Sequence, residues 1–116
     1  MSIWIDADRF EELVGEALDL IPFELAAAMD NVVVLVAERN PDEPRLLGLY
    51  EGIALTERDS TYGGVLPDRI TLYREALLDI CADEQQLVDE VAVTVVHEIA
   101  HHFGIPEHRL HELGWG

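Results

Sequence analysis

The chain has 116 residues, a length that predicts one domain, residues 1–116, built around a single core. Its 24 acidic residues against 7 basic ones give a formal net charge of −17, which would repel nucleic acid and anionic membranes and excludes both as expected partners. A solubilising acidic surface explains this charge most simply, and attraction of a basic substrate or partner is the alternative.

The sequence contains no segment that points to a membrane or to secretion. It has no run of eighteen apolar residues, and its start, Met1 to Asp6, has neither a basic region nor a long apolar stretch. Cys81 is the single cysteine, so a disulfide within the chain is excluded. These features predict a cytoplasmic protein.

The N-terminal part of the chain is predicted to be helical. Asp6 is a suitable N-cap for a helix over about residues 7–21. Apolar residues recur there at spacings of three and four, as in an amphipathic helix: Phe10, Leu13, Val14, Ala17, Leu18 and Ile21. A short second helix is expected over residues 23–29, after Pro22.

The middle of the chain is predicted to contribute three strands. Residues 32–37 are apolar and mostly β-branched, which favours a strand covered on both faces. Residues 46–51 give a second strand, and residues 69–73 alternate as a third. The glycine-containing connection 52–67 is long for a small domain, and it is interpreted either as a lid or cleft wall or as a floppy loop.

A long helix is predicted after these strands. Asp83 is its expected N-cap, with Gln86 in the reciprocal place of a capping box, and the helix runs to about Phe103. The element order, with helices before and after a group of strands, favours the α+β class: a small sheet with helices packed on it.

His97, Glu98 and His101 form an H-E-x-x-H motif inside this helix. Residues four apart lie on one helix face, so His97 and His101 can direct their imidazoles to one metal ion, for which zinc is the expected choice. Glu98 is rotated about 100° from His97, within reach of a water on the metal. An accidental pair of histidines is the alternative interpretation; the apolar residues before the motif and Gly104 after it argue against accident.

The stretch from His97 to Glu107 reads H-E-x-x-H-x-x-G-x-x-E and resembles the zincin metallopeptidases, specifically the metzincin-like branch. With residues 66–74 and the ending 111–115, it resembles a family of very small bacterial zincin-like proteins. A Met-turn is missing, because both methionines lie upstream of the motif. The resemblance implies a zincin-like fold with the active helix behind a small mixed sheet. It also implies an edge strand that pairs with substrate; residues 69–73 are the candidate, and an ordinary inner strand is the alternative.

The resemblance places a third zinc ligand at Glu107, and His108 is the competing candidate. Gly104 can end the helix in the left-handed conformation, and Pro106 disfavours a return to helix at the residue before it. In an extended stretch, neighbouring side chains point in opposite directions, so only one of the pair can face the metal. Glu107 is therefore predicted as the ligand. His102, about 140° round the helix from His97, is a poor ligand for the same ion.

These residues predict a zinc-dependent metallohydrolase, most simply a peptidase, in which Glu98 is the general base for a zinc-bound water and Zn²⁺ is held by His97, His101 and Glu107. The alternative is a zinc-binding domain of this fold with little or no hydrolysis, acting in protein interaction. A peptide or protein is the expected substrate. The small size leaves little wall for a specificity pocket, so a partner protein or a homodimer is a candidate for completing the cleft.

Overall fold

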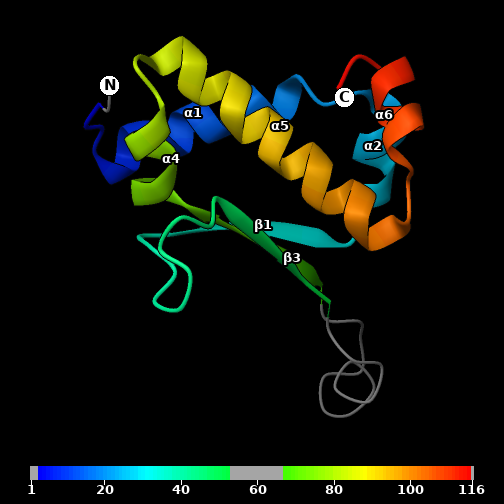
Figure 1. The fold of residues 1–116 in the computed structure, drawn as a ribbon, viewed down its shortest axis with the longest axis horizontal. Coiled ribbons are helices and arrows are strands. Elements are labelled where there is room, and N and C mark those ends of the chain that lie inside the picture. Colours follow the sequence, from blue (N-terminus) through cyan, green and yellow to red (C-terminus); the bar gives the residue numbers. More distant parts are fainter. Residues whose placement is uncertain (1–2, 53–66, 116) are drawn as a thin grey trace.

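The structure, a computed structural model, describes residues 3–52 and 67–115. It is an α+β fold in which the helices gather on one face of a small sheet (Figure 1). The predicted class is therefore confirmed. The predicted lid or loop over 52–67 lies almost wholly outside the described residues. Within the described ranges, no helix is long and apolar enough to cross a membrane.

The N-terminal helices form as their sequence predicts. Helix α1 spans Ala7–Asp19, and the carboxylate of Asp6 caps it by accepting a hydrogen bond from the Arg9 amide at 2.8 Å. Its apolar face is buried against α5. Helix α2, Phe23–Ala26, continues into the 3₁₀ turn η1, Ala27–Met29.

In the described part of the chain, three strands make a mixed sheet in the order β1-β3-β2. Strand β1, Val32–Ala37, pairs with β3, Asp68–Tyr73, in parallel, and β2, Gly48–Glu51, pairs with β3 antiparallel. Because β3 is central, residues 69–73 are an inner strand, and the prediction of an edge strand there is wrong. The described edge strand that contacts α5 is β2.

Strand β1 is half-buried on one face and exposed on the other, which corrects the prediction of cover on both faces. Val33 and Leu35 are 40% and 46% exposed, whereas Val34 between them packs against the core. The helices lie on the core face of the sheet, and none of the described helices covers the other face (Figure 1). An apolar run in a strand therefore does not require two covering layers.

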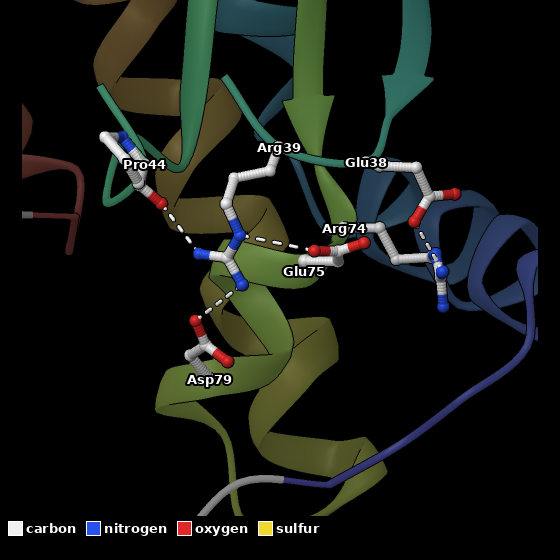
Figure 2. A network of polar contacts seen from close by, with 6 residues as sticks. All are labelled: Glu38, Arg39, Pro44, Arg74, Glu75 and Asp79. Carbon is white, nitrogen blue, oxygen red and sulfur yellow. Dashed lines mark hydrogen bonds and ion pairs between the residues drawn. The ribbon is translucent and has the colours of Figure 1, made fainter. Parts of the chain in front are cut away.

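Helix α4, Arg74–Ile80, follows β3 directly and was not among the predicted elements. Ion pairs join its first two turns to the end of β1 and the loop that follows (Figure 2). The guanidinium of Arg39 contacts Glu75, Asp79 and the Pro44 carbonyl. Arg74 contacts Glu38. These contacts fix the loop that leads into β2.

Helix α5, Glu84–Phe103, is the central element of the core. Asp83 caps it as predicted, while the Gln86 side chain accepts from the amide of Ala82, one residue before the expected capping-box partner. Gly104 ends α5 with φ 69°, in the predicted left-handed conformation. A last helix, α6, Glu107–Glu112, follows where only a tail was expected.

Candidate active site

His97 and His101 lie one turn apart near the C-terminal end of α5, with ring centroids 6.3 Å apart. Neighbouring residues of α5 are fully buried, among them Val95, Val96 and Ile99. This burial fixes the rotation of α5 about its axis, so the histidines must line its open side. His97 is half-buried and His101 is exposed.

Glu98 is oriented by strand β2. Its Oε1 atom accepts a hydrogen bond from the backbone amide of Tyr50 at 3.0 Å. The close approach depends on Gly48, because a Cβ atom there would lie 2.7 Å from Cγ2 of Thr94 on α5. A larger residue at position 48 would push the strand and helix apart.

The C-terminal segment reaches His97. The Nε2 atom of His97 lies 3.0 Å from the backbone carbonyl oxygen of Trp115. A carbonyl can only accept, so in this hydrogen bond the imidazole carries its proton on Nε2. Nε2 of His97, a predicted metal ligand, is therefore hydrogen-bonded to the backbone of Trp115.

The predicted third ligand lies in α6. Glu107 is exposed in the first turn of that helix, and His108 is exposed beside it. Residues 107–112 are helical, so the argument from an extended backbone, by which one of these two side chains must face away from the metal, is wrong. The assignment of Glu107 as the third ligand stays a prediction.

The donor types in this region fit zinc, since two imidazoles and a carboxylate are a common catalytic set. The geometry supplies two of them on one helix face. Among the described residues, no group of three or more His, Cys, Asp or Glu side chains is placed to hold a metal ion. A complete site needs a third donor beside His97 and His101.

A second polar group, not predicted from the sequence, borders the site. The Tyr50 hydroxyl donates to Oδ2 of Asp68 at 2.7 Å, and the His102 ring stacks on Tyr50 at 3.9 Å. His102 Nε2 also lies 3.9 Å from the same carboxylate oxygen. The side chain of His102 thus packs on β2. Only the position of Asp68, at the start of a predicted strand, could have indicated its role.

Two hollows flank His97. One, of about 400 Å³, is largely apolar and is lined by residues including Leu20, Val93 and Trp115. The other, of about 340 Å³, lies between the approach to β2 and α5, and both Glu90 and Glu98 line it. Both hollows include Val93 and His97, so the imidazole stands between two concave surfaces.

Comparisons with known proteins bear on the family and the fold of the chain. A family model described as zincin-like metallopeptidase matches residues 29–115, a span that includes the sheet, α5 and α6. Among solved structures, a conserved hypothetical protein from Thermo thermophilus is similar, with a TM-score of 0.56 and 23% identity over 85% of this chain and 94% of that one. That likeness concerns the fold. The comparison with curated proteins found no match.

Proposed function

Because the chain belongs to the zincin-like metallopeptidase family, we propose that it is a zinc-dependent hydrolase that cleaves peptide bonds. The observation that carries this proposal is the placement of the H-E-x-x-H residues. His97 and His101 share the open side of α5, and Glu98 is held by a backbone amide of β2. Both His97 and Glu98 line a hollow large enough for part of a peptide.

In the proposed reaction, His97, His101 and Glu107 would hold the metal. Zinc, when bound, supplies a Lewis acid that activates water and polarises a carbonyl oxygen. Glu98 accepts the proton released by the attacking water and delivers it to the leaving amine. The amide of Tyr50 keeps the Glu98 carboxylate in place during both transfers.

The hollows on either side of His97 support a peptide or protein as substrate. An extended chain that crosses α5 at Val93 and His97 can place a side chain in each. Strand β2 is the described edge next to the motif, and edge strands commonly pair with extended peptides. Because both hollows are open and shallow, we also propose that a partner protein or second copy completes their walls.

A second candidate function is zinc binding with little or no hydrolysis, in the service of protein interaction. The lack of a Met-turn after the motif favours this alternative, because this chain departs there from the metzincin peptidases that it resembles. The two functions share the metal and differ in turnover. They are therefore separated by a measurement of hydrolysis on protein whose zinc content is known.

The substitution Glu98→Gln tests the hydrolase. It removes the proton acceptor while preserving size, and we expect zinc content to stay unchanged and peptide hydrolysis to fall about 10²-fold or more. Glu16→Gln is the matched control and should keep full activity, since Glu16 is exposed on α1 and lines neither hollow. Full activity in Glu98→Gln would exclude Glu98 as the base, and zinc-loaded wild type inactive on a broad peptide library would favour the binding function.

A further inference from the structure

The contact between the C-terminal segment and His97 has a consequence for metal binding. We propose that the carbonyl of Trp115 and a zinc ion compete for Nε2 of His97, so that the docked segment restrains metal binding and bound metal releases the segment. This inference rests on the proposed function only in taking His97 as a zinc ligand.

The competition follows from the chemistry of imidazole. At 3.0 Å from a carbonyl oxygen, Nε2 must donate its hydrogen, and a protonated ring nitrogen has no lone pair for a metal. Zinc at Nε2 would require that hydrogen to move through solvent to Nδ1, and the ion would then take the direction from Nε2 that the carbonyl oxygen now holds, so the contact would break. If zinc instead used Nδ1, the carbonyl would orient the ring and strengthen metal binding. Removing the contact should therefore raise the affinity for zinc if the ion binds Nε2, and lower it if the ion binds Nδ1.

The segment is held by a defined capping structure. Gly114 follows the end of α6 with φ 87°. The amide of Trp115 donates to the Leu110 carbonyl at 2.8 Å, and the amide of Gly114 donates to the His111 carbonyl at 3.0 Å. These two bonds form a Schellman motif, which directs the Trp115 carbonyl toward α5. The half-buried Trp115 side chain packs against the core and adds an apolar anchor.

Metal coordination can displace this segment because, among the described residues, few other contacts hold it. Past the buried Leu110, the residues from His111 to Trp115 are exposed or half-buried. One neutral hydrogen bond and a partly packed indole contribute much less free energy than coordination of zinc by several ligands. Helix α6 itself stays anchored by the buried Leu110 and by the ion pair of Arg109 with Glu24.

Tryptophan fluorescence reports the release directly. The chain has two tryptophans, and Trp4 is 76% exposed, so Trp4→Phe leaves Trp115 as the sole reporter without removing buried contacts. On titration of this variant with zinc sulfate, we expect the emission of Trp115 to shift to longer wavelength as the indole enters water. The same titration after the further substitution His97→Ala should give no shift.

Gly114→Ala tests whether the docked C-terminal segment weakens or strengthens zinc binding. A Cβ at position 114 would meet nothing within 4 Å, so the substitution acts through the strain of a positive φ and weakens the docked conformation. We expect zinc affinity to rise about two- to ten-fold, the range that one neutral hydrogen bond accounts for. Gly15→Ala in α1, also with open space around it, is the control and should leave zinc affinity unchanged. Trp115→Ala, which removes the indole anchor, should act in the same direction as Gly114→Ala.

The outcomes separate this inference from the proposed function. Lower affinity in both C-terminal variants would overturn the competition and identify the Trp115 carbonyl as an orienting partner. Tight zinc binding with unchanged Trp115 emission would overturn it as well, while leaving zinc binding by the motif intact. No zinc binding by wild type or by either variant would overturn both.

Discussion

The two sides of the candidate site are built differently. On one side, His97 and Glu98 lie on a long helix whose opposite face is fully buried, and Glu98 is bonded to β2. On the other side, α6 and the residues after it are largely exposed, apart from Leu110, and a capping motif holds their end. The first side is fixed by packing, whereas the second has little packing beyond Leu110. In such a site, the helix sets where a metal would bind, and the C-terminal segment sets how tightly.

The largest expected effect is the loss of zinc affinity when a proposed ligand on either side is removed. His101→Ala should lower affinity by more than about 10²-fold, because loss of a ligand exceeds the 10- to 100-fold effect of changing a residue that only supports one. Glu107→Ala, which removes the proposed third ligand, should also lower affinity by about 10²-fold or more, and His108→Ala should leave it near the wild-type value. Calorimetric titration with zinc measures all three. Tight binding kept in Glu107→Ala and lost in His108→Ala would make His108 the third ligand.

A smaller effect, on the free energy of unfolding, is expected where β2 lies closest to α5. Gly48→Ala places a Cβ 2.7 Å from Cγ2 of Thr94, and we expect a loss of about 1–3 kcal/mol in the free energy of unfolding. Gly15→Ala, in helix α1 with open space around it, should instead stabilise the protein by about 0.5–1 kcal/mol. Urea denaturation followed by circular dichroism compares the two. Equal effects would show that β2 and α5 are not in tight contact.

The smallest effect is expected at the surface, at the far end of α5. The hydrogen bond from Arg9 lowers the pKa of Glu84 below its ordinary value of 4.5. A carboxyl with a lowered folded-state pKa stabilises the protein above its ordinary pKa and loses that contribution as the pH falls through the lowered value. Thermal melts should therefore show Arg9→Gln slightly less stable than wild type at pH 7, with the difference vanishing well below pH 4.5. A difference that persists in acid would mean that Arg9 acts through packing.

The elements with local signals were predictable from the sequence. Asp83 and Gly104 mark the two ends of α5, and the structure places the ends of the helix directly beside them. The fold class followed from the order of such elements. The four-residue spacing of His97 and His101 likewise determined that they share a helix face.

The features that depend on long-range pairing were not predictable from the sequence. Nothing within residues 69–73 reveals that β3 pairs on both sides, with β1 and with β2. The apolar residues of β1 carry no sign that one face stays open. The contact of Trp115 with His97 joins residues 18 positions apart through a turn, a helix and a second capping motif, so no local pattern could indicate it.

The hydrogen bond from the Tyr50 amide gives the two carboxylate oxygens of Glu98 different roles. With Oε1 bonded to the backbone at 3.0 Å, Oε2 is the oxygen left to take a proton. In the proposed reaction the proton would always travel on the same atom, and the side chain would not need to rotate between taking it and giving it up. Strand β2 would thus set the direction of proton transfer as well as the wall of the cleft.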